Sequence, residues 1–281
     1  MRKEHILNSP RFEEYKKKKS KNLRKKVYIF LFLFLIVFIS LVFVSRIEKI
    51  NIDQIIVLGN KVIDTKDIEN IAQEKLDQKY IGLFPKSNTF VFPEKSIKNN
   101  LLTNFKRLTD VNLKVKDNKI LEISVTEREG KYIWCGDVKP IENTLDQKCY
   151  FLDTDGYIFD TAPYFSDGVY LKLYGKINNE NKIGTYFAQE SFKNIVHFKD
   201  LVEKMNLKIR SVSIQENKDM NMYLSTGAEI RFNSLSDVEK LSQSLQAAMI
   251  TPPFSTDFKN NPTSLLYIDL RFGNKVYFKF K

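Results

Sequence analysis

The residues that come closest to a catalytic pattern are Asp153 and Asp155, which stand one residue apart and precede Gly156. An apolar stretch leads into them, so both carboxylates would emerge from the same end of a strand. In phosphoryl transfer, one such carboxylate attacks phosphorus while a second serves as general acid or base. An Asp-Gly pair between two apolar runs is also a strong signal for a hairpin turn. We favour the hairpin, because short strands and turns follow the pair.

The spacing resembles the aspartate-nucleophile signature of haloacid-dehalogenase-type phosphatases, but that family has Thr or Val at the position of Tyr157. A calcium-binding EF-hand loop would need Glu at its twelfth position, and the sequence lacks it. With two His and two Cys, little material remains for a zinc or iron–sulfur site. We therefore expect a protein that is not an enzyme and that takes no cofactor or small-molecule substrate.

The basic charge of the chain is concentrated beside its longest apolar segment. Residues 1–26 hold eleven Lys or Arg against three Glu, in a chain whose net charge is +11. Val27–Val44 follows without a charged residue, and as a helix it would span roughly 27 Å, close to the thickness of the hydrocarbon core. The sequence predicts a cytoplasmic basic tail over 1–26 and a transmembrane helix over 27–45 that contacts membrane lipid.

The positive-inside rule places the N-terminus in the cytoplasm and residues 46–281 outside, as in a single-pass type II protein of the cell membrane. A cleaved signal peptide is one alternative. Its apolar region is typically about 7–15 residues long, and Phe43 interrupts the best cleavage site, which ends at Ser45. A buried helix is the other alternative. Nucleic acid is not expected as a partner, because membrane orientation already accounts for the basic run.

The two cysteines, Cys135 and Cys149, would both lie outside the membrane, where disulfides persist. A bridge would close a loop of about fifteen residues and contribute roughly 3 kcal/mol in the chain-entropy model. Two free buried thiols and a thiol nucleophile are the alternatives. A nucleophile is disfavoured, because His197 is the one histidine beyond the membrane segment and lies far away in sequence. We expect the disulfide.

Residues 50–128 are predicted to form a compact unit with the element order β-α-α-β-β. Apolar residues recur at helical spacing in its middle and alternate with polar residues at its end. The predicted elements are a strand over 52–58 that ends at Gly59-Asn60, a helix from Asp64 or Thr65, a helix that buries Ile97 and Leu101, and two strands that meet at Asp117-Asn118.

Residues 129–281 are predicted to form a mostly antiparallel β domain with two helices, so the fold class of the chain is α+β. One helix is expected at about 188–206. The other is expected to begin at Ser236, where Ser236 and Glu239 match a capping box. At the boundary between the two domains, the charged run Glu127–Glu129 is interpreted as a solvated strand end.

Five short motifs occur in an order that resembles the FtsQ/DivIB family of bacterial cell division proteins. They follow the basic tail and the membrane helix, and together they cover nearly the whole chain. The resemblance implies a POTRA domain over 50–128 and an FtsQ/DivIB-like β domain over 129–281. The chain departs from the family at Glu129-Gly130, near which a proline is usual. The motifs are Ile52-x-x-Ile55-x-Val57-x-Gly59-Asn60, Val125-Thr-Glu127-Arg128, Trp134 with Tyr150–Phe159, Lys240-Leu241, and Ile268-Asp-Leu-Arg271-Phe272.

The resemblance further implies a non-enzymatic scaffold of the divisome, located at the division septum, that helps control septal peptidoglycan synthesis. Its partners would be FtsB-like and FtsL-like proteins, bound through the C-terminal edge strand, because an edge strand can pair with a strand of another chain. The alternative is a POTRA-bearing membrane component of a transport or secretion system. The implied partner-binding residues are Arg271, Phe272, Gly273, Val276 and Phe278, with Ile55, Val57 and Leu58 as a secondary surface.

Overall fold

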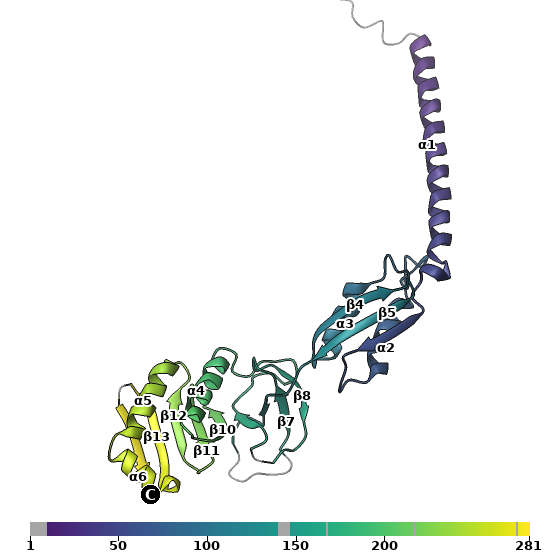
Figure 1. Cartoon of the computed structure of the whole chain (residues 1–281). Helices are drawn as coiled ribbons and strands as arrows, with labels where there is room; N and C mark the ends of the chain where they lie inside the picture. The colour runs from purple at the N-terminus through teal and green to yellow at the C-terminus, as the bar shows by residue number, and fades with distance from the viewer. Residues whose placement is uncertain (1–9, 140–146, 167, 216, 274) are drawn as a thin grey trace, which may run out of the picture. The chain divides into compact units, whose positions relative to one another are not determined.

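The computed structural model describes residues 10–139, 147–166, 168–215, 217–273 and 275–281 (Figure 1). The chain forms two compact units. The first contains residues up to Thr103 together with Asp110–Thr126, and the second contains Asn104–Thr109 together with Glu127–Lys281. The fold is α+β, with a long apolar helix, a small three-stranded sheet and a large, mostly antiparallel sheet.

Helix α1, Pro10–Ser45, contains the predicted membrane span. Its stretch Glu14–Ser45 is long and apolar enough to cross a membrane, and its most apolar part is not buried against the rest of the protein. A helix suits this environment, because it satisfies its backbone hydrogen bonds internally. The helix also continues through the basic segment from Pro10 onward; residues 1–9 of the predicted tail lie outside the described residues.

The first unit has the predicted element order with one addition. Strand β1 lies parallel to β5, and β4 completes the sheet in the order β1-β5-β4. The hairpin β2–β3 separates the two helices and was not predicted, because each of its strands has only two residues. The elements are a 3-10 helix at Glu48–Ile50, β1 (Gln54–Leu58), α2 (Thr65–Leu76), β2 (Lys79–Tyr80), β3 (Phe84–Pro85), α3 (Glu94–Asn104), β4 (Leu108–Lys116) and β5 (Ile120–Glu127).

Local sequence signals fix the ends of these elements. Asp64 caps α2, because its carboxylate accepts a hydrogen bond from the Lys66 amide at 2.9 Å. Gly59 follows β1 with a φ of +87°, and a Cβ there would lie 2.3 Å from the Val125 carbonyl oxygen, so a side chain does not fit. Asp117-Asn118 adopts positive φ at both positions, as a two-residue type I′ turn requires. The predicted turns and the helix start are therefore confirmed.

The second unit is built on a nine-stranded sheet in the order β14-β13-β12-β11-β10-β9-β6-β7-β8. Most neighbouring strands are antiparallel, but β6 with β9, β9 with β10, and β12 with β13 are parallel. The strands are β6 (Tyr132–Trp134), β7 (Cys149–Leu152), β8 (Ile158–Ala162), β9 (Leu171–Tyr174), β10 (Ile209–Ile214), β11 (Asp219–Leu224), β12 (Glu229–Asn233), β13 (Leu265–Phe272) and β14 (Lys275–Phe280). The helices are α4 (Phe192–Lys204), α5 (Val238–Ile250), α6 (Phe254–Asn260) and a 3-10 helix at Pro262–Ser264.

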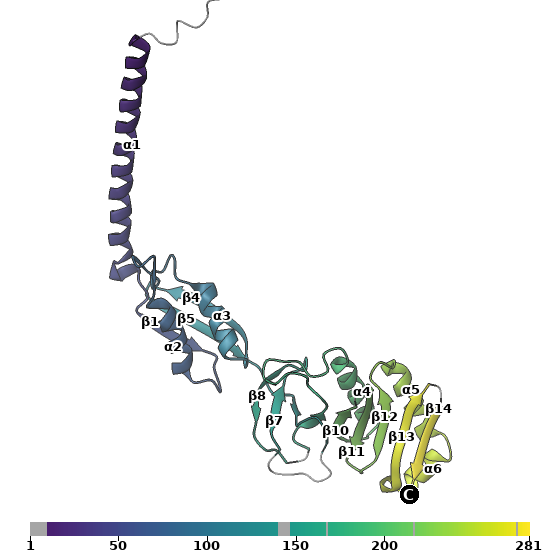
Figure 2. The ribbon, with the colours of Figure 1, turned by 180° about the vertical axis from the view of Figure 1, so that it is seen from behind.

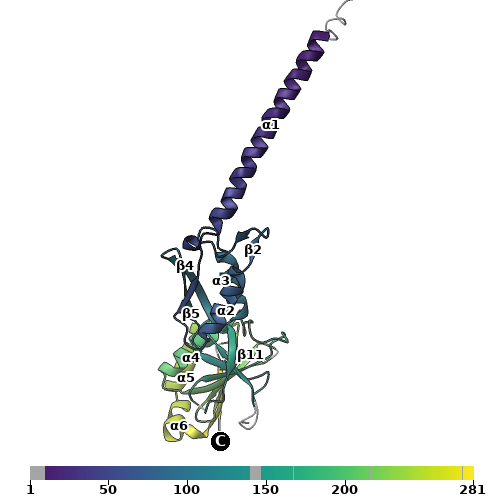
Figure 3. The same cartoon turned by 90° about the vertical axis from the view of Figure 1, so that its right-hand side faces the viewer.

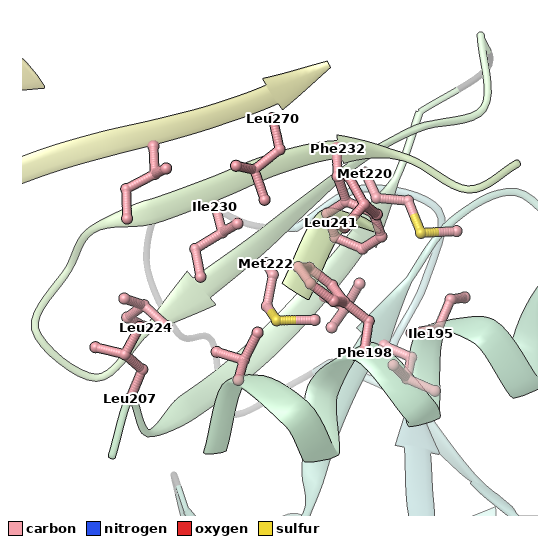
Figure 4. Packing of buried hydrophobic residues seen from close by; sticks show 14 of the residues in the cluster. Ile195, Phe198, Leu207, Met220, Met222, Leu224, Ile230, Phe232, Leu241 and Leu270 are labelled. Carbon is pink, nitrogen blue, oxygen red and sulfur yellow. The ribbon is translucent and has the colours of Figure 1, made fainter. Parts of the chain in front are cut away.

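Helices α4 and α5 pack an apolar core against one face of this sheet (Figure 4). Phe198 of α4 is fully buried, and its ring contacts the Phe232 ring of β12 edge to face at 4.7 Å. Leu241 and Leu245 of α5 are buried in the same core. Burying a side chain of this size stabilises a fold by about 1.5–3 kcal/mol, so this core fixes the positions of the strands.

Two details of the second unit differ from the sequence prediction. Asp237, rather than Ser236, caps α5: its carboxylate accepts hydrogen bonds from the amides of Glu239 and Lys240. Both residue types are good caps, and the sequence did not distinguish the two positions. The unit also has a third helix, α6, where two were predicted, because seven residues are too few to show a clear helical period.

Cys135 and Cys149 form a disulfide. Successive residues of a strand face opposite sides of a sheet. Trp134 therefore joins the main core, while Ile133 and Cys135 form a small second core with Tyr174. The bridge links the end of β6 to the start of β7 across this second core. Residues 140–146 of the bridged loop lie outside the described residues.

The disulfide gives the first testable prediction. Changing both Cys135 and Cys149 to Ser should lower the free energy of unfolding of the second unit by roughly 3 kcal/mol, because the open loop gives the unfolded chain more freedom. Trp134 is the one tryptophan and is 4% exposed, so its fluorescence during urea unfolding of the full chain in detergent reports on this unit. A reducing agent should destabilise the wild type by the same amount and leave the double variant unchanged. An equal stability of wild type and variant would contradict the prediction.

Candidate partner-binding edge

Strand β14 is the outermost strand at one end of the large sheet (Figure 2). Among the described strands, β13 is its one neighbour. The Lys281 amide, directly after β14, donates to the Ser264 carbonyl oxygen at 2.9 Å, on the side of β13. Amides two residues apart on a regular strand point the same way. The amides of Val276 and Phe278 therefore point toward the outer edge.

The side of β14 that faces the helices is apolar. Val276, Phe278 and Phe280 are half-buried and alternate with exposed residues, as the sequence predicts for a strand with one buried face. Phe254 of α6 is 1% exposed. The centroid of its ring lies 5.0 Å from that of Phe278 and 5.5 Å from that of Phe280. This aromatic cluster anchors β14 and leaves its outer backbone accessible.

A groove of about 490 Å³ lies between α5 and this side of β14. Val276 and Phe278, two of the residues implied by the family resemblance, line it. Small side chains on the last turns of α5 leave the groove open, and sequence reasoning did not identify them, because Ala247 and Ala248 look like ordinary helix residues. The remaining lining residues are Gln243, Ser244, Ala247, Ala248, Thr251, Pro252 and Phe254. A strand that paired with β14 would direct alternate side chains into this groove.

Arg271 lies on the opposite, open side of β13 and joins two carboxylates. Its guanidinium donates to Asp269 at 2.9 and 2.6 Å and to Asp219 of β11 at 2.7 Å. Burial raises the pKa of both carboxyls, but the opposing contributions together outweigh it and leave both pKa values below the ordinary value. They are the hydrogen bonds and charge of Arg271 for both groups, with hydrogen bonds from Asn233 and Asn217 at Asp219 and the charge of Arg231 at Asp269. The hydrogen bonds with the two aspartates also raise the pKa of Arg271. No local pattern points to Asp219, because it lies far from Arg271 along the chain.

The other implied residues have distinct surroundings. Phe272 is 56% exposed, and its ring meets that of Tyr277, also exposed, edge to face at 5.1 Å. Gly273 lies in the turn between β13 and β14 with a φ of +65°, a conformation that favours glycine. The structure thus brings Phe272 and Tyr277 together as an exposed aromatic pair, while Gly273 shapes the turn and Arg271 joins β13 to β11.

The secondary surface belongs to the first unit. Strand β1 is an edge strand of the three-stranded sheet, because β5 is its one neighbour among the described strands of that sheet. Ile55 and Val57 are half-buried, and Leu58 is 47% exposed. This surface is smaller and less exposed in its centre than the edge of the second unit.

The Asp153-Asp155 pair lies in a hairpin turn between β7 and β8, as predicted. One oxygen of Asp153 accepts hydrogen bonds from the amides of Asp155 and Tyr157 at 2.9 and 3.0 Å, and the other forms an ion pair with Arg128. The Asp155 carboxylate is instead exposed beside Lys193. The Asp153 carboxylate therefore holds the turn together and is not paired with Asp155.

The interpretation of the run Glu127–Glu129 as a solvated strand end is wrong for Arg128. Its side chain is 22% exposed, stacks over the Tyr157 ring at 4.4 Å and forms the ion pair with Asp153. Arg107 forms a similar ion pair with Asp160 at 2.6 Å. The partners of both arginines lie in or beside the predicted hairpin, so only the three-dimensional fold reveals the pairing. Within the described residues, no three His, Cys, Asp or Glu side chains gather as a metal site.

No protein-family model matches this chain, and no curated protein matches it either.

The ion pairs of Arg271 predict how stability depends on pH. Arg271→Gln should lower the free energy of unfolding near neutral pH by about 1.5–3 kcal/mol, the usual range for hydrogen bonds to charged groups. Because the folded-state pKa values of Asp219 and Asp269 lie below the ordinary 3.8, their contribution is present above pH 3.8 and is lost as the pH falls below it.

Urea unfolding of wild type and variant between neutral and acidic pH checks this. The stability difference should shrink as the pH falls through about 4 toward 2. Lys279→Gln removes a cation from an exposed position on β14 and serves as the control, with a small and pH-independent effect. A difference for Arg271→Gln that stayed constant with pH would rule out the carboxylates as its cause.

Proposed function

We propose that this chain is a single-pass membrane protein of the FtsQ/DivIB type, a non-enzymatic scaffold of bacterial cell division. FtsB-like and FtsL-like proteins are its partners, and β14 is the site at which a partner strand binds. The single observation that carries the proposal is the outermost strand β14 with an open groove beside it. The five motifs that resemble the family give the partners their identity.

The architecture of the first unit supports the assignment. Its order is β-α-α-β-β apart from the short inserted hairpin, and β1 lies parallel to β5. This is the element order that the family resemblance implies for a POTRA domain. The apolar helix α1 precedes these elements, and the second unit supplies a large sheet with helices on one face.

Strand addition explains how the edge recognises a partner. Backbone hydrogen bonds between β14 and the incoming strand supply affinity, and pockets for alternate side chains supply specificity. The amides of Val276 and Phe278 are the donors on the β14 side. On the other face of the hairpin, Phe272 and Tyr277 form an aromatic anchor, the kind of residue that dominates binding energy at interfaces.

Arg271 has an indirect role in this proposal. Three of its five N–H groups are used by Asp269 and Asp219, and its side chain is 32% exposed. It therefore holds β13, and through β13 the edge strand, in position. A partner carboxylate would meet a cation that two aspartates already neutralise.

Orientation follows from charge. The basic residues before the apolar run place the N-terminus in the cytoplasm, and residues 46–281 lie outside, at the division septum. The disulfide between Cys135 and Cys149 fits this location, because disulfides persist outside the cytoplasm. Control of septal peptidoglycan synthesis would be exerted through the bound partners.

A proline at position 276 tests strand addition. Val276→Pro removes an outward amide and places its ring where a partner strand would pair, whereas the hydrogen bonds to β13 are kept. Binding of full-length protein to the outer segments of the FtsB-like and FtsL-like partners should weaken roughly tenfold or more. Val276→Ala is the matched control: it shortens the side chain in the groove, keeps the amide and should bind more tightly than the proline variant.

Three results would contradict this model in different ways. Equal weakening by Pro and Ala would assign binding to the groove side chain without strand pairing. Unchanged binding in both variants would move the interface away from β14, and Leu58→Asp on β1 would then be tested. Failure of folded wild type to bind either partner would reject the divisome assignment itself. Trp134 fluorescence during unfolding establishes that each variant is folded.

A further inference from the structure

The turn of the β2–β3 hairpin carries apolar side chains that the first unit does not bury. Ile81 is 88% exposed, and Leu83 is also exposed. The neighbouring turn adds Phe90, which is 76% exposed, and Val91. The Tyr80 hydroxyl donates to the Val91 carbonyl oxygen at 3.0 Å and joins this turn to the hairpin. We call Ile81, Leu83, Phe90 and Val91 the hairpin surface.

The hairpin contacts the last turns of α1. Figure 3 shows β2 near the C-terminal end of that helix. The Phe84 ring meets the Phe38 ring edge to face at 5.8 Å. The Arg46 guanidinium donates to the Leu83 carbonyl oxygen at 3.3 Å. Of the apolar run Val27–Val44, only Phe38 and Val42 are partly covered, and they lie four residues apart on one face of the helix.

Polar contacts fix the end of α1 to the first unit. The Asn51 and Asn88 side chains donate to the Ser45 carbonyl oxygen at 3.0 and 3.2 Å, and Asn88 is 4% exposed. The last carbonyls of a helix lack partners within the helix. The side-chain amides of Asn51 and Asn88 supply the missing hydrogen-bond donors. Because Asn88 lies just after β3, its hydrogen bond helps to hold the hairpin beside the helix.

The contact with Phe38 determines how deep the hairpin would lie in a membrane that α1 crosses. Phe38 lies six residues before Val44, which corresponds to roughly 9 Å along the helix axis. Interfacial segments bury their apolar side by about 5–10 Å into a membrane. If α1 crosses a membrane, Phe84 therefore lies at the depth of the acyl chains, and the exposed side chains beside it lie at the interface.

The turn itself has an unusual residue for its backbone. Ile81 and Gly82 adopt φ values of +52° and +69°. Glycine accepts this conformation, and Asn or Asp commonly precedes it, but a β-branched residue is strained there. An exposed isoleucine contributes no packing inside the protein at this position. Its side chain is therefore available for a contact outside the protein.

We propose that the hairpin surface inserts into the membrane leaflet from which the C-terminal end of α1 emerges. The inference rests on the membrane span of the proposed function and adds a second lipid contact to it. Cations near the surface would meet lipid phosphates, an attraction that strengthens binding to anionic membranes. The charged residues that flank the hairpin surface in the sequence are Lys79, Lys86 and Lys95 with Asp77 and Glu94, and those that follow α1 are Arg46, Glu48 and Lys49.

Tryptophan quenching in vesicles tests the insertion. The full-length chain is placed in phosphatidylcholine and phosphatidylglycerol vesicles whose acyl chains carry bromine, which quenches tryptophan on contact. Ile81→Trp and Phe90→Trp should each show blue-shifted, quenched emission above the background of buried Trp134. Val62→Trp is the matched control, because Val62 is 64% exposed in the same unit, beyond the far end of β1. Its emission should be neither shifted nor quenched.

A second variant separates lipid contact from folding. Ile81→Asn suits the positive φ of the turn and removes the apolar side chain, so it should keep or raise the stability of the first unit. In the Phe90→Trp protein, Ile81→Asn should reduce quenching and shift emission to the red. Val62→Asn in the same background should change neither.

Alkaline extraction of the vesicles separates the two proposals. Release of the wild-type chain would reject the membrane span itself. The chain could instead stay in the membrane while Ile81→Trp and Phe90→Trp are quenched no more than Val62→Trp. That result would overturn the hairpin insertion alone. Strong quenching of Phe90→Trp that Ile81→Asn reduces without loss of folding would support it.

Discussion

An open sheet must end, and its last strand leaves one side of its backbone without a partner in the sheet. In the second unit this strand is β14, with α5 and α6 packed against one of its faces. Proteins commonly protect such an edge with charged side chains. Lys275 and Lys279 are exposed on β14, where they oppose unspecific pairing. These lysines would not block a strand whose side chains fit the groove, since they lie on the face of β14 away from it.

Electrostatics on the open face and packing on the covered face hold this edge together. Arg271 joins β13 to β11 across the sheet through two aspartates, and Arg231 stacks over the Tyr267 ring at 4.5 Å. On the covered side, Phe254 fixes Phe278. These contacts hold β14 in place, so under the proposed function a partner strand would not have to order it first. Preorganisation of this kind reduces the entropic cost of binding.

Much of the architecture could be predicted from local signals. Periodicity located the apolar helix and the strands with alternating residues, and Gly59 and Asp117-Asn118 marked their turns, because backbone conformation at those positions depends on neighbouring residues. The hairpin β2–β3 and helix α6 were missed, since short elements show no period. For the candidate site, alternation identified β14 and its inward side chains. The pairs Arg271–Asp219 and Arg128–Asp153, and the groove beside α5, arise from contacts between distant segments, which no local pattern encodes.

The parallel pairing of β12 with β13 has a consequence for the order of assembly. Two parallel neighbours cannot be joined by a tight turn, so the chain leaves β12, runs through α5 and α6, and returns to place β13 beside it. Closing such a long crossover is slow compared with forming a hairpin. We therefore expect the β13–β14 hairpin to join the sheet later than the strands that tight turns connect. Under the proposed function, a chain in which this crossover has not closed would offer a partner strand no edge, so binding would depend on completed folding of the unit.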